Sequence, residues 1–332
     1  MSRAQLTSTV EQNSAGAAAP FLAGKNKIIN GDFFWAQRGT TFSTSGYNID
    51  RWGTTVSGSG STYSVTQTAN TPASITGYEP AYNLQYAVTA AGSVTYRDIY
   101  QRIEDVHTLA GQTVTISFYA KADSARTITS YFYQNFGSGG SSDYNSGTIG
   151  THNITTAWQR FTVTGVMPSI SGKTIGAGSW TSLVFALPTT TFTLNITGIQ
   201  LEAGSVATPF STCSNTLQGE LALCQRYFWQ ISSANIDRVA AQAISSTRAF
   251  GPLPLPVTMR TAPSYSFAAA SNFGLINSSG GVLTCTTVSI AAQATNMVTL
   301  DFTSSGGGLT AGNATACWFQ STSSTIALSA EL

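Results

Sequence analysis

Apolar and polar residues alternate in short runs along most of the chain, which is the pattern of half-buried β-strands. Gly- and Ser-rich stretches such as Ser57–Ser61 and Gly137–Ser142 separate the runs. The clearest runs of β-branched and aromatic residues are Thr113–Lys121, Arg126–Gln134, Trp158–Thr164, Trp180–Leu187 and Thr191–Leu201. Short strands at regular spacing between residues 26 and 212 predict a two-sheet sandwich or jelly roll.

A helical period occurs once, directly after this region. Leu217, Leu221 and Cys224 are spaced at i, i+4 and i+7, and Asn215 stands where an N-cap is expected. Alternation then returns until the C-terminus, although Pro252–Pro263 is too rich in proline for a central strand and predicts an edge or a crossing loop. The predicted fold is all-β: a jelly-roll β-sandwich, a short helical connector and a second, smaller β-sandwich domain.

These patterns divide the chain into three regions. Residues 1–25 are rich in Ala, Ser, Thr and Gln without a sustained period, which predicts an arm that docks onto a neighbour. Residues 26–212 form the predicted jelly roll, and residues 213–332 contain the helix and the C-terminal β domain. Because no lysine follows Lys173 and other charges are few there, we expect this last region to carry a subunit interface and to drive oligomerisation.

Charge is scarce throughout the chain. Charged residues make up 9% of the 332 positions, against about 25% in ordinary soluble domains. The net charge of +1 provides no field for nucleic acid or an anionic membrane. The surface must therefore be covered by neutral polar residues, which suits either burial between subunits or a neutral, hydroxyl-rich partner.

No targeting or membrane segment is expected from the sequence. No run approaches the roughly 18 apolar residues of a membrane-spanning helix. Glu11, Gln12 and Asn13 occupy the place where a signal peptide needs an apolar core. We therefore expect the protein to be made in a cytosol and to remain there or leave it by lysis.

Several motifs resemble those of a known family. They are Asn26–Phe42, Tyr47–Trp52, Tyr100–Ala122 and Gly198–Phe210, followed by Glu220–Trp229 and the ending Ser329–Leu332. Together they resemble jelly-roll carbohydrate-binding modules, in particular the version found in bacteriophage appendage proteins. The resemblance implies a tail fibre, minor tail protein or head fibre, commonly a homotrimer. Such a protein assembles in the host cytoplasm, attaches to other virion proteins through its arm and touches host cell-surface glycans from the particle surface.

The alternation also predicts a binding face. Ile99, Ile103, Ile128 and Phe132, like Phe118, occupy inward positions, so their neighbours point away from the core. If these strands share one sheet, its outer face carries Tyr96, Asp98, Tyr100, Arg102, Tyr119, Tyr131 and Tyr133, with Trp180 as a further stacking platform. Aromatic rings pack on the apolar face of a sugar, and short polar side chains bind its hydroxyls. The alternative is that these tyrosines pack against a second subunit or crossing loops.

Metal ligands are sparse. The four cysteines form no C-x-x-C pair and have no neighbouring histidine, so we expect isolated thiols. The family resemblance implies a possible structural calcium near the opening strand, with Asp32 as the matching acid, although no loop has clustered acids. No other cofactor is expected.

Catalytic motifs are absent from the sequence. His107 and His152 fall in a predicted turn and a predicted loop and should face solvent, and no G-x-S-x-G serine or phosphate loop occurs. We therefore expect a non-enzymatic phage virion protein that adheres to host glycans. The alternatives are a capsid or tail decoration or scaffold subunit that binds no sugar, and a glycan depolymerase, which needs only two carboxylates.

Overall fold

The computed structural model describes residues 23–234 and 237–332, so the predicted arm lies almost wholly outside the described residues. The chain divides into two compact units, one extending to Leu221 and including Leu332, the other spanning Ala222–Glu331. The division falls inside helix α2 (Leu217–Gln225), whereas the sequence placed the boundary before the helix, at residue 212.

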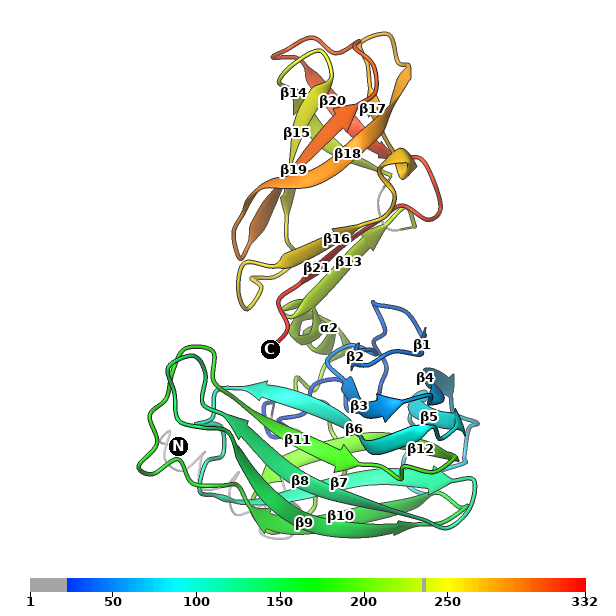
Figure 1. The fold of residues 1–332 in the computed structure, drawn as a ribbon, viewed down its shortest axis with the longest axis vertical. Helices are drawn as coiled ribbons and strands as arrows, with labels where there is room; N and C mark the ends of the chain where they lie inside the picture. The colour runs from blue at the N-terminus through cyan, green and yellow to red at the C-terminus, as the bar shows by residue number, and fades with distance from the viewer. Residues whose placement is uncertain (1–22, 235–236) are drawn as a thin grey trace, which may run out of the picture. The chain divides into compact units, whose positions relative to one another are not determined.

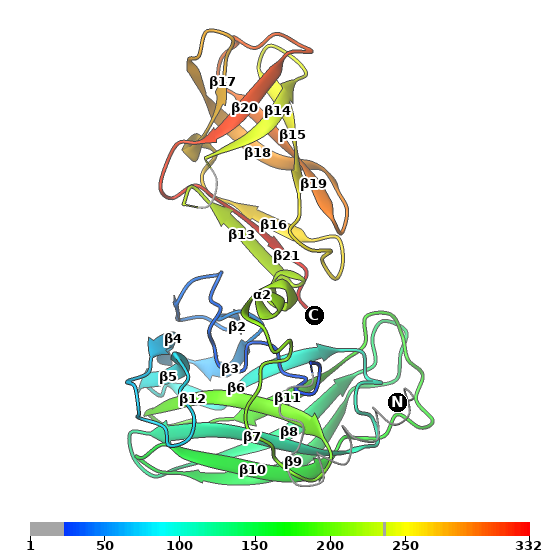
Figure 2. The same ribbon diagram turned by 180° about the vertical axis from the view of Figure 1, so that it is seen from behind.

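The first unit consists of two six-stranded antiparallel sheets (Figures 1 and 2). One has the order β1-β4-β5-β12-β7-β10 and comprises β1 (Thr41–Phe42), β4 (Thr62–Ala69), β5 (Tyr82–Ala90), β7 (Thr113–Ala122), β10 (Gln159–Val166) and β12 (Phe192–Ala203). The other has the order β2-β3-β6-β11-β8-β9 and comprises β2 (Gly46–Tyr47), β3 (Gly53–Ser59), β6 (Ser93–Glu104), β8 (Arg126–Asn135), β9 (Tyr144–Ile154) and β11 (Trp180–Ala186). We name them the β7 sheet and the β11 sheet. Because the chain passes repeatedly from one to the other, the unit is the predicted jelly-roll sandwich.

The inner faces of the two sheets form one apolar core. Ile99, Phe118, Ile128 and Phe132 are each at most 1% exposed, as the alternation predicts, and they belong to a single hydrophobic cluster. Burying a side chain of this size stabilises a fold by roughly 1.5–3 kcal/mol. The core therefore fixes which residues of each strand point outward.

The sequence-based prediction that these strands share one sheet is wrong for β7. Strand β7 pairs with β12 and β10, whereas β8 pairs with β11 and β9. Both sheets face the same core, so their strands show the same alternation, and the pattern alone cannot assign a strand to a sheet. Tyr119 of β7 therefore lies on the opposite side of the sandwich from the tyrosines of β6 and β8.

Helix α2 is confirmed, but its N-cap differs from the prediction. The Gly219 N–H donates to the Thr216 hydroxyl at 3.0 Å, which is the hydrogen bond of a capping residue. Asn215 instead adopts a positive φ of 60° in the turn before the helix. Asn tolerates this left-handed conformation better than most residues, so it serves the turn while Thr216 serves the helix.

The second unit is also all-β, but its strands close into a barrel rather than the predicted sandwich. The barrel order is β14-β15-β19-β18-β17-β20, from β14 (Arg238–Ala243), β15 (Arg248–Pro254), β17 (Phe273–Ile276), β18 (Val282–Gln293), β19 (Met297–Ser304) and β20 (Ala314–Phe319). A three-stranded sheet completes the unit, with β13 (Phe228–Ser232), β21 (Thr325–Ser329) and β16 (Ser264–Phe267), and a short 3₁₀ helix η1 (Ala270–Asn272) precedes β17. Closure satisfies strand edges that an open sheet leaves exposed.

The proline-rich stretch begins inside this barrel. Pro252 and Pro254 lie at the end of β15, where β15 still pairs with β19 but no longer with β14. A proline is tolerated there because its missing N–H is not needed for a second ladder. In the described part of the chain, no helix is long and apolar enough to cross a membrane.

Candidate functional site

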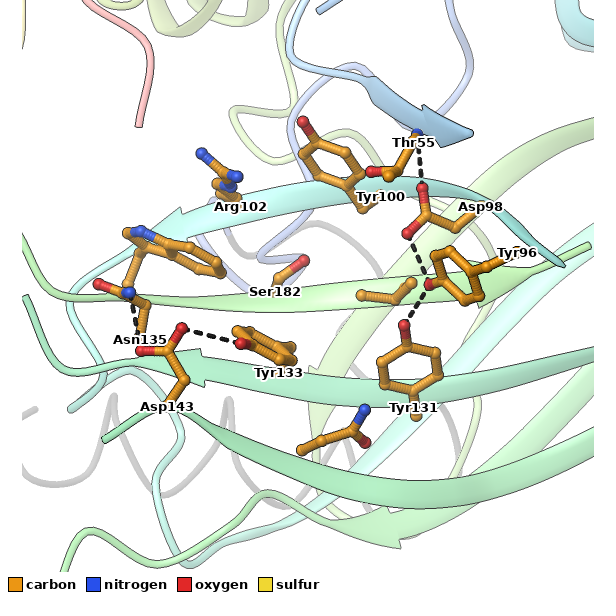
Figure 3. A pocket seen from close by; sticks show the side chains of 13 residues that line it. Thr55, Tyr96, Asp98, Tyr100, Arg102, Tyr131, Tyr133, Asn135, Asp143 and Ser182 are labelled. Carbon is orange, nitrogen blue, oxygen red and sulfur yellow. Dashed lines mark hydrogen bonds between the residues drawn. The ribbon is translucent and has the colours of Figure 1, made fainter. Parts of the chain in front are cut away.

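A groove of about 640 Å³ opens on the outer face of the β11 sheet (Figure 3). It is lined by seven of the eight residues that the sequence nominated for glycan binding: Tyr96, Asp98, Tyr100, Arg102, Tyr131, Tyr133 and Trp180. Six further residues line it: Thr55, Asn135, Asp143, Asn145, Ser182 and Val184. The eighth nominee, Tyr119, lies on the β7 sheet and takes no part.

The groove follows strand β11 because that strand carries small outward side chains between two strands with large ones. Ser182 stands between Arg102 and Tyr133 in the strand register. Val184 stands in the same way between Tyr100 and Tyr131. Opposite residues in neighbouring antiparallel strands lie about 4.5–5.5 Å apart, so β6 and β8 form the walls and β11 the floor.

A glycine on the next strand makes room for one wall. Gly53 of β3 pairs with Tyr100, and a Cβ atom at Gly53 would lie 2.4 Å from Cζ of the Tyr100 ring. The absence of a side chain at Gly53 therefore lets that ring lie close to β3. The Tyr47 ring meets Tyr100 edge-on, with the ring centroids 6.0 Å apart.

A chain of hydrogen bonds crosses one end of the groove. The Tyr96 hydroxyl donates to Asp98 Oδ2 at 2.7 Å and also bonds the Tyr131 hydroxyl. The second Asp98 oxygen, Oδ1, accepts the Thr55 N–H at 2.7 Å. Burial raises the pKa of Asp98, and burial followed by the nearby Asp98 charge raises the pKa of Tyr96. Figure 3 shows these four residues converging from β3, β6 and β8.

The other end holds an aromatic and charged cluster. The Arg102 guanidinium lies 4.3 Å from the Trp180 ring centroid, and the Tyr133 ring stacks on Trp180 with centroids 5.8 Å apart. The Tyr133 hydroxyl donates to Asp143 Oδ2, and the Asn135 amide donates to Asp143 Oδ1, each at 2.8 Å. Partial burial and then the hydrogen bond to Asp143 raise the pKa of Tyr133. These contacts hold the rings in fixed orientations.

The carboxylates of the groove are engaged by donors within the protein. These two carboxylates, Asp98 and Asp143, each have both oxygens engaged by N–H or O–H donors. Neither histidine lines the groove. His107 is exposed and pairs with Asp105 at 2.6 Å. The predicted exposure of His152 is wrong, because it lies in β9, is 4% exposed and bonds the Ser130 hydroxyl at 3.0 Å.

Two of the six additional groove residues could have been predicted from the sequence pattern. Ser182 and Val184 follow Trp180 at every second position of the same predicted strand, so extending the alternation would have placed them on this face. Asp143 and Asn145 follow a Gly- and Ser-rich stretch in which no period exists. Their position depends on the irregular register of the β8–β9 hairpin, which shifts near Tyr131.

The described residues around Asp32 offer few free oxygen atoms to the calcium ion that the family resemblance implies. One Asp32 oxygen is buried without a hydrogen-bond partner, but the nearby Glu220 already accepts the N–H groups of Asn30 and Ser214 with its two oxygens. Burial and the Glu220 charge raise the pKa of Asp32 to about 6. Calcium needs six to eight oxygen ligands, and the described residues contain no cluster of three or more His, Cys, Asp or Glu able to hold a metal. The calcium remains a prediction.

The four cysteines are free thiols, and three of them are buried. Cys213 is the half-buried one, and desolvation raises the pKa of its own thiol to about 11. This suppresses the thiolate that metal binding or nucleophilic chemistry would require.

Comparison with known proteins yields similarities to solved structures alone. No family model and no curated protein matches the sequence. A family 4 carbohydrate-binding module is 23% identical, with 53% of this chain and 99% of that chain covered and a TM-score of 0.36. The C-terminal family 22 module of Clostridium thermocellum Xyn10B is 14% identical, with 56% and 99% covered and a TM-score of 0.35.

A phage protein is also among the similar structures. The enzymatically active domain of tailspike protein 4 from bacteriophage CBA120 is 15% identical, with 54% of this chain and 22% of that chain covered and a TM-score of 0.37. The class of the first unit is defined by its own two sheets: it is a jelly-roll β-sandwich.

Proposed function

We propose that the jelly-roll unit binds a glycan in the groove along β11. The observation that carries this proposal is the arrangement of Tyr100, Tyr131 and Tyr133 on two walls beside a floor of small residues. A pyranose presents an apolar face to such rings, while its hydroxyls meet the polar groups at either end. Because the residues are held by contacts within the protein, little ordering is required when a ligand binds.

We further propose that the protein is a bacteriophage virion appendage, a tail fibre, minor tail protein or head fibre displayed on the particle. The order of sequence motifs supports this, as does the low charge of the chain. In the second unit, Arg248 pairs with Asp301 at 2.6 Å and Arg238 with Asp237 at 3.1 Å, so these charges are satisfied internally. This suits a homotrimer that assembles in the host cytoplasm through neutral surfaces, while residues 1–25 attach it to other virion proteins.

In this proposal the groove adheres without cleaving. A retaining or inverting glycosidase needs one carboxyl group to deliver a proton and a second to attack or to activate water. Asp98 is 5% exposed and its oxygens accept bonds from Thr55 and Tyr96, so it is placed to orient other groups. We expect no release of reducing ends from host polysaccharide.

The test measures mass and binding on one sample. Light scattering should give three times the chain mass of 34.8 kDa, and the same sample should bind host-surface polysaccharide. Replacing Tyr131 and Tyr133 together by Ala should weaken binding about 10- to 100-fold, because each ring contributes on the order of 1 kcal/mol. Tyr144→Ala is the matched control, since Tyr144 is 44% exposed beside the groove but does not line it.

Each outcome identifies a different function. A trimer that binds no polysaccharide would favour the decoration or scaffold subunit, with the tyrosines packing against a neighbour. Release of reducing ends would establish a depolymerase. A stable monomer would overturn the argument from the uncharged surface.

A further inference from the structure

We infer that the groove selects neutral glycans over acidic ones because the hydroxyls of Tyr131 and Tyr133 are held as hydrogen-bond acceptors. This inference rests on the proposed glycan binding and names the class of sugar. It follows from the direction of the hydrogen bonds that the Tyr96, Tyr131 and Tyr133 hydroxyls make, starting from the partners that can only donate or only accept.

At the first end, the direction of the chain is set by Thr55 and Asp98. A backbone N–H can only donate a hydrogen bond, and an ionised carboxylate can only accept one. Asp98 therefore accepts hydrogen bonds from the Thr55 N–H and the Tyr96 hydroxyl. The Tyr96 proton is thereby committed to Asp98. The hydrogen bond between the Tyr96 and Tyr131 hydroxyls then requires Tyr131 to donate. What Tyr131 offers the groove is its oxygen lone pairs.

At the second end, Asp143 plays the same part. It accepts the Tyr133 hydroxyl proton on Oδ2 and an Asn135 amide proton on Oδ1. The Tyr133 hydroxyl therefore also faces a ligand as an acceptor. Strand β8 supplies the tyrosine at both ends, but a different carboxylate fixes each hydroxyl, and both impose the same polarity.

Tyrosine oxygens that can only accept hydrogen bonds favour neutral sugars over acidic ones. A sugar hydroxyl can donate to Tyr131 and Tyr133, whereas a carboxylate, sulfate or phosphate ester offers no proton and meets lone pairs instead. Two carboxylates line the groove, and Arg102 is the one cation among the lining residues, with its guanidinium over Trp180. The lining therefore carries a net negative charge that disfavours uronic acids and other anionic sugars.

Replacing Asp98 by Asn should reverse the first chain. The Thr55 N–H requires an acceptor, so the amide oxygen of Asn must face Thr55 and its NH₂ group must face Tyr96. Tyr96 then accepts from the amide and donates to Tyr131, and the Tyr131 proton becomes free to point into the groove. In the variant, the Tyr131 hydroxyl donates to a ligand where it accepts in the native protein, and the groove loses one negative charge.

The experiment compares neutral and acidic probes of equal length. Galactan and galacturonan oligosaccharides, with glucan and sulfated glucan as a second pair, are titrated against the full chain by calorimetry. We expect the native protein to bind the neutral member of a pair at least tenfold more tightly. In Asp98→Asn this ratio should fall to within about threefold, through both weaker neutral and stronger acidic binding.

Two further variants make the outcome decisive. Asp143→Asn removes the charge on a solvent-exposed residue and should lower the ratio even if Asp98→Asn does not fold. Asp123→Asn is the charge-matched control, because Asp123 pairs with Arg126 away from the groove, and it should leave the ratio unchanged.

The possible results separate the two proposals. If the native protein binds no glycan, the proposed function fails and this inference fails with it. If it binds acidic probes as tightly as neutral ones, glycan binding stands and the selection by hydroxyl direction is overturned. An unchanged preference in a folded Asp98→Asn or in Asp143→Asn would also overturn it.

Discussion

The two outer faces of the jelly roll carry similar residues but have become different surfaces. Tyr119 on the β7 sheet and Tyr131 on the β11 sheet both occupy outward positions of amphipathic strands. Tyr119 is 9% exposed and stacks on Tyr78, with ring centroids 5.0 Å apart. Tyr131 lines an open groove. The two faces differ because other segments of the chain pack over Tyr119 and leave the groove at Tyr131 open.

The cover on the β7 sheet has two layers: Tyr78, from the segment between β4 and β5, lies on Tyr119, and the segment that follows β12 packs on Tyr78. Thr208 donates its N–H to Glu202 Oε1 at 2.9 Å and its hydroxyl to Oε2 at 2.8 Å, while Lys25 pairs with the same carboxylate at 3.2 Å. These bonds hold the segment down, and the Phe210 ring at its end packs on Tyr78, with centroids 5.1 Å apart. An outward aromatic residue therefore becomes structural where a loop is fastened over it and remains available where none is.

The comparison is tested most strongly at Tyr119. Tyr119→Ala should remove a buried ring and lower the stability of the fold by about 3 kcal/mol, which corresponds to a drop in Tm of roughly 6–12 °C for a unit of this size. Glycan affinity should be unchanged. Calorimetric melting and polysaccharide titration on the same variant measure both. A loss of affinity without a loss of Tm would mean that Tyr119 belongs to a binding site after all.

The two sheets should each contribute to the pH dependence of the unfolding free energy, but in different pH ranges. Burial lowers the pKa of His152, on β9 of the β11 sheet, to about 4, below the ordinary value near 6.5. The unfolded chain therefore binds the proton first, and stability is complete above pH 6.5 and is lost as the pH falls toward 4, by roughly 2–3 kcal/mol. His152→Gln should abolish this part of the pH dependence, as urea unfolding at pH 7 and pH 4.5 would measure.

On the β7 sheet, Glu202 should change the unfolding free energy only at lower pH. Burial would raise the pKa of Glu202, but its bonds from Thr208, Gln200 and Lys25 outweigh burial and lower it. Its contribution is therefore present above its ordinary pKa and lost below, as the pH falls through the lowered folded-state value. Glu202→Gln should flatten the unfolding free energy in that acidic range and leave the range between pH 4.5 and 6.5 as it was. If His152→Gln and Glu202→Gln alter the unfolding free energy in the same pH range, the assignment of separate ranges to the two sheets is wrong.

The smallest expected effect concerns Gly53. Gly53→Ala places a methyl group where the Tyr100 ring lies and should shift that ring, weakening glycan binding about three- to tenfold, or on the order of 1 kcal/mol. Gly111→Ala serves as a control because a Cβ there meets no atom within 4 Å, although its positive φ of 71° costs some stability. Equal affinity in Gly53→Ala and the native protein would mean that Tyr100 does not contact the ligand.

The sequence predicted the all-β class, helix α2 and the inward positions of β6, β7 and β8, because each of these depends on local periodicity. It also nominated seven of the residues that the fold gathers into the groove. It misplaced Tyr119 because sheet membership depends on how the chain crosses between layers. It missed Asp143 because a hairpin with an irregular register carries no period, and it missed the burial of His152, which depends on Phe118 in the facing sheet, 4.9 Å away between ring centroids.

The central place of β11 in its sheet also bears on how the protein acquires its shape. Ser182 pairs with Arg102, eighty residues earlier, and with Tyr133, forty-nine residues earlier. Pairings so distant in sequence close slowly, because long loops must be ordered before the contacts that stabilise them exist. During synthesis the walls on β6 and β8 emerge well before the strand that joins them, so the nascent chain exposes unpaired strand edges until β11 arrives.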